Sequence, residues 1–201
     1  MPNWVTPDIL TILGLIASII ICVFYFLTNY NWNFIWIVNL GFLLNWFGDS
    51  LDGTLARYRK IERPKYGFFV DHIADIFAQF LIALGVGLSP YMRFDFALYA
   101  VMGYLMLEML THITTYVCGI FRISYGKIGP TEVRVVIILI NTLVYYMNNP
   151  KLKIWFLQLT LFDLLAFIIG TLFIIGFLIF SIKQIRILAI EDPPKNSKIN
   201  R

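Results

Sequence analysis

Hydrophobic residues form long continuous runs along this chain, and polar residues are gathered between the runs. A helix of about 20 apolar residues is long enough to cross the hydrocarbon core of a bilayer. We therefore predict six membrane-spanning helices, at about residues 9–27, 34–47, 67–88, 97–121, 131–147 and 154–182. The second run is short, but no helix breaker follows it, so we expect this helix to continue beyond the bilayer. The predicted fold class is an all-α membrane protein.

The composition argues against an ordinary soluble domain. Of the 201 residues, 59% are hydrophobic and 14% are charged, whereas soluble domains are closer to half apolar and a quarter charged. We expect residues 1–190 to form a single membrane domain. Residues 191–201 contain two adjacent prolines and no apolar periodicity, which predicts a disordered cytoplasmic tail.

The distribution of Lys and Arg predicts the orientation of the helices. Six crossings place both termini on one side of the membrane, and 13 of the 16 Lys and Arg residues then fall on that side. Because positive charge is enriched in cytoplasmic segments, we expect both termini in the cytoplasm and a multi-pass protein of the cytoplasmic (inner) membrane. This topology, with contact to anionic lipid headgroups, explains the net charge of +4. A nucleic-acid partner is therefore not expected.

Four aspartates lie at the end of the second predicted helix and the start of the third. Asp49 and Asp52 share one face of the second helix, and Asp71 and Asp75 share one face of the third. The short polar connection between the helices allows these two faces to turn toward each other. The pattern therefore predicts a cleft lined by four carboxylates at the cytoplasmic ends of the second and third helices.

Four ionised carboxylates in one cleft repel one another and require a cation. Their oxygen atoms suit hard divalent ions, and Mg²⁺ often keeps the oxygens of a phosphate-bearing substrate in its coordination shell. The small residues Gly53 and Ala56 leave room beside the carboxylates for a flat or extended ligand. The alternative is that each aspartate forms an ion pair with a nearby Arg or Lys. Four carboxylates in matching helical phase near a membrane favour the metal site.

The segment from Asp49 to Asp75 resembles the signature of the CDP-alcohol phosphatidyltransferases, D-x2-D-G-x2-A-R-x8-G-x3-D-x3-D. Every fixed residue is present, and the single difference is that nine residues rather than eight separate Arg57 from Gly67. One extra residue in this polar connection should cost little. Residues 2–6 are similar to the Pro-Asn-x-x-Thr opening common in these enzymes. The resemblance also implies the six-helix fold predicted above.

By this resemblance, the protein would displace CMP from a CDP-linked alcohol and transfer the phosphoryl-alcohol group to an acceptor hydroxyl. Two Mg²⁺ or Mn²⁺ ions are expected, with metal ligands from Asp49, Asp52, Asp71 and Asp75. Asp75 would also serve as the general base for the acceptor hydroxyl. The residues expected to bind the nucleotide are Asn3, Thr6, Gly53, Ala56, Arg57 and Gly67. The family further implies a homodimer that works among membrane lipids.

Two kinds of donor remain open. Family frequency favours CDP-diacylglycerol with a small alcohol as acceptor, and basic residues near the fourth-to-fifth connection could bind an anionic acceptor. These residues are Arg122, Lys127 and Arg134, the last being favoured because it begins a helix after a Gly-Pro break. Equally, all three could be ordinary positive-inside residues. The other donor is a CDP-aminoalcohol with diacylglycerol as acceptor, which is favoured by His72, because an Asp-His pair resembles that branch of the family.

Other ionisable residues lie inside the predicted spans. Glu108 and His112 are one helical turn apart, and we interpret them as a structural pair in which each neutralises the other. Asp163 has no partner that the sequence identifies. An ion-coupled transporter is a different class of function, but transporter sites usually lie near the membrane midplane at broken helices. The aspartates here lie at one membrane face, which favours the transferase.

Overall fold

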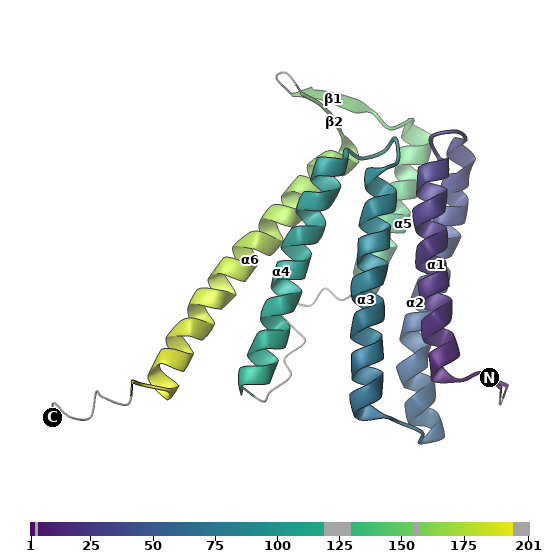
Figure 1. Ribbon diagram of the computed structural model, residues 1–201. Coiled ribbons are helices and arrows are strands. Elements are labelled where there is room, and N and C mark those ends of the chain that lie inside the picture. Colours follow the sequence, from purple (N-terminus) through teal and green to yellow (C-terminus); the bar gives the residue numbers. More distant parts are fainter. Residues whose placement is uncertain (3, 119–129, 155–156, 195–201) are drawn as a thin grey trace.

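The computed structural model describes residues 1–2, 4–118, 130–154 and 157–194, and it consists of long helices with one small β-hairpin (Figure 1). The helices are α1 (Pro7–Leu27), α2 (Ile35–Arg59), α3 (Pro64–Gly87), α4 (Phe94–Cys118), α5 (Pro130–Met147) and α6 (Leu161–Glu191). A 3₁₀ turn, η1 (Trp32–Phe34), precedes α2. Strands β1 (Lys151–Ile154) and β2 (Leu157–Thr160) pair antiparallel.

Among the described residues, five helices are long and apolar enough to cross a membrane, namely α1, α2 with η1, α3, α4 and α6. The apolar part of α5, Val133–Met147, is shorter. An 18-residue helix is about 27 Å long, slightly less than the hydrocarbon core of about 30 Å. Large apolar side chains such as Ile12, Ile16 and Ile19 of α1 are exposed, as expected for a surface that faces lipid. The prediction of a helical multi-pass membrane protein is confirmed, and the described residues form five long apolar helices and one shorter one.

The predicted sixth helix begins too early in the sequence analysis. The structure shows a hairpin over Lys151–Thr160, and α6 runs from Leu161 to Glu191 rather than over 154–182. The reason is local. Polar and apolar residues alternate in both strands, as is typical of a half-exposed hairpin. Thr160 and Asp163 then form a capping box, in which each side chain accepts a hydrogen bond from the other residue's backbone, and this begins the helix.

Helix boundaries near the aspartates also follow from local chemistry. The Thr6 side chain caps α1 by accepting a hydrogen bond from the amide of Ile9, and Pro7 occupies the first turn. At the other end of this region, α2 stops where Lys60 adopts a left-handed conformation with φ of 56°. A proline, Pro64, begins α3 after a four-residue connection. This short connection holds the end of α2 beside the start of α3.

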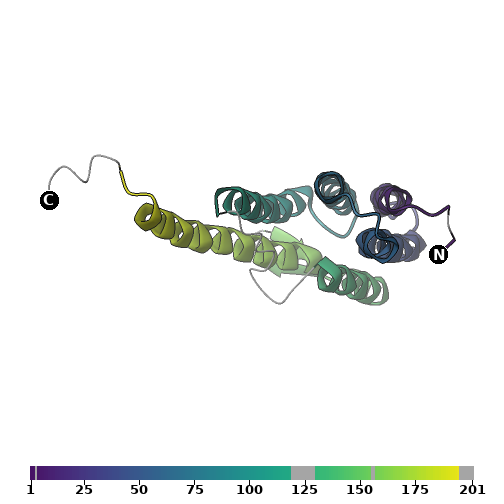
Figure 2. The ribbon, with the colours of Figure 1, turned by 90° about the horizontal axis from the view of Figure 1, so that it is seen from below.

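The helices pack as two groups that meet along α3. One group places α1 against α2 and α3, with α5 on α2, and the other places α4 along α6 (Figures 1 and 2). Buried side chains of α1, α2 and neighbouring elements form the main hydrophobic core, including Ile21, Tyr25 and Phe42. Tyr25 donates a hydrogen bond to Asn141 Oδ1, and Asn141 donates to Asn39 Oδ1, each at 2.8 Å. This buried chain of hydrogen bonds joins α1, α5 and α2.

Two glycines allow helix backbones to approach closely. A Cβ atom at Gly48 of α2 would lie 2.6 Å from the carbonyl oxygen of Leu10 in α1. A Cβ atom at Gly85 of α3 would lie 2.6 Å from Cα of Cys22 in α1. Small residues permit such approach between membrane helices. Since Gly48 precedes Asp49, the α1–α2 crossing places the first aspartate of the motif.

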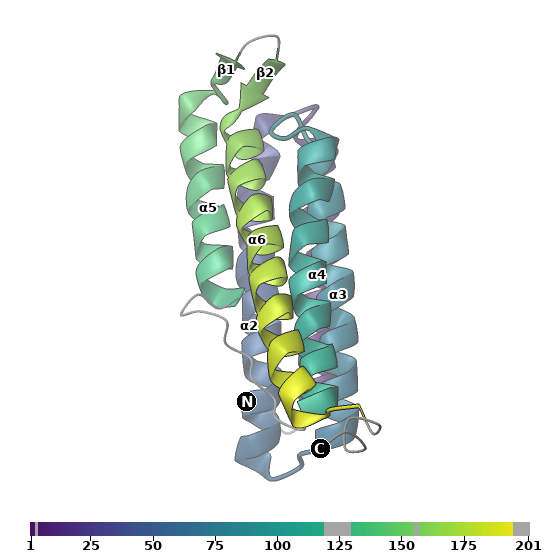
Figure 3. The same cartoon turned by 90° about the vertical axis from the view of Figure 1, so that its left-hand side faces the viewer.

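The start of α1, the α2–α3 connection and the end of α6 lie at one end of the molecule, and the hairpin lies at the other (Figures 1 and 3). This agrees with an even number of crossings. The predicted domain boundary at residue 190 falls at the last turn of α6. Residues 195–201 of the predicted tail lie outside the described residues. Which side of the membrane each end faces stays a prediction.

Candidate active site

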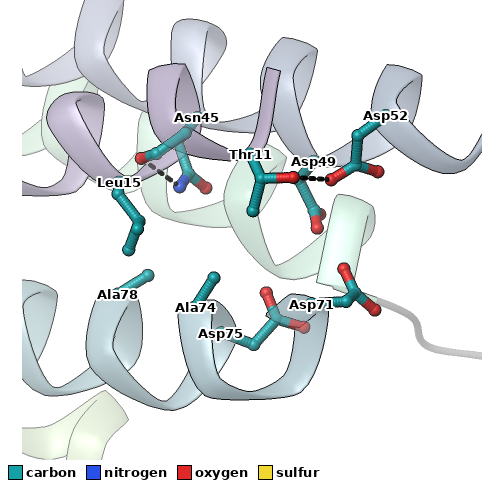
Figure 4. Close-up of a pocket in the computed structure, with 10 residues that line it drawn as sticks. Thr11, Leu15, Asn45, Asp49, Asp52, Asp71, Ala74, Asp75 and Ala78 are labelled. Atoms are coloured by element: carbon teal, nitrogen blue, oxygen red, sulfur yellow. Dashed lines mark hydrogen bonds between the residues drawn. The ribbon is translucent and has the colours of Figure 1, made fainter. Parts of the chain in front are cut away.

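A small pocket lies between α1, α2 and α3, toward the α2–α3 connection, and its free volume is about 20 Å³. All four aspartates of the motif line it (Figure 4). The complete set of lining residues is Thr11, Gly14, Leu15, Asn45, Asp49, Asp52, Asp71, Ala74, Asp75 and Ala78. The two faces predicted from helical phase therefore do turn toward each other.

Three of the four aspartates form a close cluster. Asp49 of α2 and Asp71 and Asp75 of α3 each offer a carboxylate oxygen, and these oxygens all lie within 4.8 Å of one another. Because Mg²⁺ binds oxygen at about 2.1 Å, ligands on opposite sides of the ion lie roughly 4 Å apart. Carboxylate oxygens are also the ligands that hard divalent ions select. The spacing and chemistry of this donor set therefore fit Mg²⁺ or Mn²⁺.

Asp52 lines the same pocket but is not part of this cluster. Its Oδ2 accepts a hydrogen bond of 2.8 Å from the Thr11 hydroxyl, and its Oδ1 accepts one from the amide of Gly53. Figure 4 shows the Thr11 contact between α1 and α2. The sequence offered no signal for this contact, because Thr11 is 41 residues away. The role of Asp52 as a metal ligand stays a prediction.

Arg134 reaches the carboxylates from α5. Its Nη1 lies 2.8 Å from Asp49 Oδ2, and the side chains of the two residues are 14% and 25% exposed. A half-buried guanidinium beside a carboxylate offsets part of the negative charge of the cluster. The structure thus places Arg134 at the candidate site, paired with Asp49, and its role in binding an acceptor stays a prediction. Arg122 and Lys127, the other predicted acceptor-binding residues, lie outside the described residues.

Four of the predicted nucleotide-binding residues lie between the aspartates and the α2–α3 connection. Gly53, Ala56 and Arg57 occupy the last turns of α2, and Gly67 occupies the first turn of α3. The Arg57 guanidinium donates to the Thr54 hydroxyl at 3.3 Å and folds back over Gly53, where a Cβ would lie 3.4 Å from its Nη1. A Cβ at Gly67 would meet no described atom within 4 Å. This open space leaves room for a ligand.

Sequence reasoning missed two arginines that hold the start of the chain at this end. Arg59 of α2 donates hydrogen bonds to the backbone carbonyls of Met1, Pro2 and Val5. Arg63 lies 2.7 Å from Asp8, and this hydrogen bond raises the pKa of the exposed Arg63 guanidinium. Only their basic character was visible in the sequence. These contacts place Met1, Pro2 and Val5 beside the end of α2, whereas Asn3 lies outside the described residues.

A second polar group lies between α3 and α4, next to the carboxylates. His72 follows Asp71, and its ring stacks on Phe68 with centroids 4.0 Å apart. The His72 and His112 rings meet edge to face at 4.9 Å. His112 Nε2 is 3.9 Å from Glu108 Oε1, while Glu108 Oε2 is buried and has no hydrogen-bond partner among the described residues. The structural pairing of Glu108 with His112 thus stays a prediction, with His72 as an additional neighbour.

Asp163 lies far from the carboxylates and has a structural role. It is fully buried at the start of α6. Its Oδ2 accepts a hydrogen bond from the amide of Thr160 at 2.8 Å, and its Oδ1 accepts one from the amide of Arg93 at 2.7 Å. The partners that the sequence did not identify are therefore backbone groups of the hairpin and of the α3–α4 connection.

The helices and the carboxylate cluster define a multi-pass membrane protein with a candidate divalent-metal site. The model of the CDP-alcohol phosphatidyltransferase family matches residues 4–175, and the chain belongs to this family. The matched region contains α1 to α5, the whole aspartate motif and Arg134. The family prediction from the sequence motif is confirmed.

Three curated relatives show how the chain relates to named proteins. Phosphatidylinositol phosphate synthase of Cutibacterium acnes is 38% identical over 85 residues, covering 42% of this chain and 38% of that protein. Cholinephosphotransferase 1 of Danio rerio is 28% identical over 190 residues, covering 86% of this chain and 48% of that protein. The Homo sapiens cholinephosphotransferase 1 is 23% identical over 186 residues, covering 86% and 45%. The chain spans less than half the length of each of these relatives.

Proposed function

We propose that this protein transfers a substituted phosphate group from a CDP-linked donor to an acceptor hydroxyl and releases CMP. The observation that carries the proposal is the cluster of Asp49, Asp71 and Asp75, whose oxygens lie within 4.8 Å of one another at the family motif. Family membership over residues 4–175 supports the same reaction class. A transporter is disfavoured, because transporter sites usually lie at broken helices, whereas α2 and α3 run without interruption past the cluster.

The residues of the site suit the steps of this reaction. The acceptor oxygen forms a bond to phosphorus, the bond from that phosphorus to CMP breaks, and CMP leaves with the electron pair. We propose that the Asp75 carboxylate takes the proton from the acceptor hydroxyl. Divalent ions, when bound by the aspartates, supply positive charge that stabilises the phosphoryl oxygens in the transition state. Arg134 holds the Asp49 carboxylate in place through its ion pair.

For the donor, we infer that a CDP-aminoalcohol is a better candidate than CDP-diacylglycerol, which the sequence alone favoured. The matches to proteins named cholinephosphotransferase 1 extend over 86% of the chain, whereas the match to phosphatidylinositol phosphate synthase extends over 42%. In addition, Arg134 is engaged by Asp49, which weakens the argument that it binds an anionic acceptor. Diacylglycerol would then be the acceptor.

The test is a direct assay of CMP release. Purified protein is supplied with Mg²⁺ or Mn²⁺ and with CDP-choline, CDP-ethanolamine or CDP-diacylglycerol, each against diacylglycerol, glycerol phosphate, inositol phosphate and serine. We expect CMP with a CDP-aminoalcohol and diacylglycerol. Release of CMP with CDP-diacylglycerol alone would reverse the donor assignment, and no release with any pair would contradict the reaction class.

The Asp75→Asn variant tests the assignment of the general base. We expect it to abolish CMP release while metal-dependent binding of the CDP donor remains largely intact, because the amide cannot accept the proton. Donor binding is measured separately by titration. CMP release by Asp75→Asn at the wild-type rate would contradict the proposed role of Asp75.

We also propose that the carboxylate end of the helices faces the cytoplasm, in the cytoplasmic membrane, and that the protein acts as a homodimer. The bias of Lys and Arg supports this orientation, and the homodimer rests on the family resemblance. The orientation is tested by placing a single cysteine in the α2–α3 connection and treating intact cells with a thiol reagent that does not cross the membrane. We expect no labelling of this cysteine, and labelling would contradict the orientation.

A further inference from the structure

Asn45 is a buried polar residue that the family motif does not include. It lies on α2 one helical turn before Asp49, so the Cβ atoms of these two residues are about 5–6 Å apart. The side chain is 3% exposed and lines the same pocket as the carboxylates. Figure 4 places it at the inner end of the pocket, beside Leu15 and Ala78 and away from Asp52 and Asp71.

Two hydrogen bonds determine how the Asn45 amide is turned. Its Nδ2 donates to the Gly14 carbonyl at 3.1 Å and to the Ser18 hydroxyl at 3.0 Å. A carbonyl oxygen only accepts hydrogen bonds, so the amide nitrogen must face Gly14. The opposite orientation would place two oxygens against each other. The Asn45 Oδ1 atom is therefore the free end of the amide.

This oxygen has no partner in the part of the chain that the structure describes. Asn45 Oδ1 is buried and accepts no hydrogen bond from any described residue. A nearby hydroxyl, Thr11, is already engaged, since it lies 2.8 Å from Asp52 Oδ2 and 3.2 Å from the Pro7 carbonyl. Buried acceptors in proteins are nearly always satisfied by protein or by ordered water. The described residues supply no donor for this oxygen, and a water molecule in the pocket would supply one.

The free volume and the chemistry of the pocket indicate what this donor is. A free volume of about 20 Å³ is enough to hold a water molecule. Such a water needs two to four polar partners, and the other acidic groups of the pocket are acceptors. Mg²⁺ is six-coordinate and usually retains several waters when protein carboxylates bind it. A water on a cation is also a strong hydrogen-bond donor.

We propose that Asn45 Oδ1 accepts a hydrogen bond from a water molecule in the coordination shell of the cation held by Asp49, Asp71 and Asp75. This inference rests on the metal site of the proposed function and adds a positioning residue to it. Asn45 orients that water from the inner end of the pocket, and the hydrogen bonds from Nδ2 to α1 hold Asn45 itself in place. Partners of metal-bound groups typically change metal affinity 10–100-fold when they are removed.

The test is a titration of the purified full-length chain with Mn²⁺, in which free Mn²⁺ is measured by electron paramagnetic resonance. Asn45→Leu keeps the approximate size of the side chain and removes Oδ1, so we expect the Kd for Mn²⁺ to rise 10–100-fold. Ser18→Ala is the matched control, because it removes one hydrogen bond to Asn45 Nδ2 and leaves Oδ1 present. For this control we expect a change of less than about 2-fold. Thermal unfolding without metal establishes that each variant is folded.

Equal Mn²⁺ affinity in wild type and Asn45→Leu would overturn the inference and leave the proposed function standing. Equal weakening by both variants would also overturn it, because affinity would then follow α1–α2 packing. Wild-type protein that binds no Mn²⁺ would overturn the proposed metal site itself. If Asn45→Leu does not fold, a structure of the wild type with Mn²⁺ decides. A water within hydrogen-bond distance of Asn45 Oδ1 and bound to Mn²⁺ supports the inference, and a shell without one refutes it.

Discussion

Replacing Gly48 with alanine perturbs the crossing of α1 and α2 that places Asp49. The new Cβ would lie 2.6 Å from the Leu10 carbonyl oxygen and 2.8 Å from the Gly14 amide nitrogen. Ordinary contacts of carbon are near 3.5 Å, so the helices must separate by roughly 1 Å. Both neighbours are backbone atoms and cannot rotate aside. We expect a loss of about 2 kcal/mol in the free energy of unfolding, within the range for overpacked sites.

Gly14→Ala is the matched control, because Gly14 lies at the same crossing on the opposite helix. A Cβ there would lie 3.7 Å from the Asn45 carbonyl oxygen, which is an ordinary contact. Alanine also favours the helix by about 1 kcal/mol over glycine, so this variant should melt at or slightly above the wild-type temperature.

The assay is thermal unfolding of both variants in the same detergent, followed by tryptophan fluorescence. A loss of about 2 kcal/mol corresponds to a decrease of about 4–8 °C in Tm for a chain of this size. We also expect Gly48→Ala to weaken Mn²⁺ binding, since Asp49 moves with the backbone of α2. Equal melting temperatures for the two variants would refute the close crossing.

Three further predictions concern other parts of the molecule. Asp163→Ala should lower the stability by about 2–3 kcal/mol, because the buried Thr160 amide and the partly buried Arg93 amide lose their acceptor. Asp95→Ala, which breaks an exposed ion pair with Arg93, should change Tm little. A similar Tm for both variants would contradict this. Arg134→Ala should leave the KM for the acceptor within about 2-fold of the wild-type value if the acceptor is diacylglycerol. A rise in this KM of about 10-fold or more would show that Arg134 binds an anionic acceptor through charge-assisted hydrogen bonds. Removing divalent ions with EDTA should abolish CMP release, and it should lower Tm because a bound ion stabilises the folded state. Adding Mg²⁺ or Mn²⁺ should restore both. CMP release that survives EDTA would exclude the metal role.

Much of the fold was predictable from local pattern. Long apolar runs identified the helices because a membrane span requires many consecutive apolar residues. The start of α6 was misplaced because the strands β1 and β2 are short and continue directly into an apolar helix, although their alternation and the Thr160–Asp163 capping box were visible in the sequence. The length of α5 also follows from sequence, since it ends before an Asn-Asn-Pro segment.

The candidate site was predictable in part. The phase of the aspartates on α2 and α3 placed Asp49, Asp71 and Asp75 together, because residues three or four apart share one helix face. Nothing in that phase could show that Asp52 is held by Thr11, since the contact depends on how α1 packs on α2. The role of Arg59 as the anchor of the first residues was hidden for the same reason.

By itself, the sequence determined the membrane class, the family motif and which aspartates share a helix face, because these depend on composition and on spacing within single helices. Only the tertiary structure decided that Arg134 pairs with Asp49, that Asp163 accepts a hydrogen bond from the Arg93 amide, and that Asn45 Oδ1 is buried without a partner among the described residues. Those outcomes depend on contacts between segments distant in sequence. Close helix crossings decide which side chains meet, as at Gly48, where a Cβ would lie 2.6 Å from the Leu10 carbonyl oxygen.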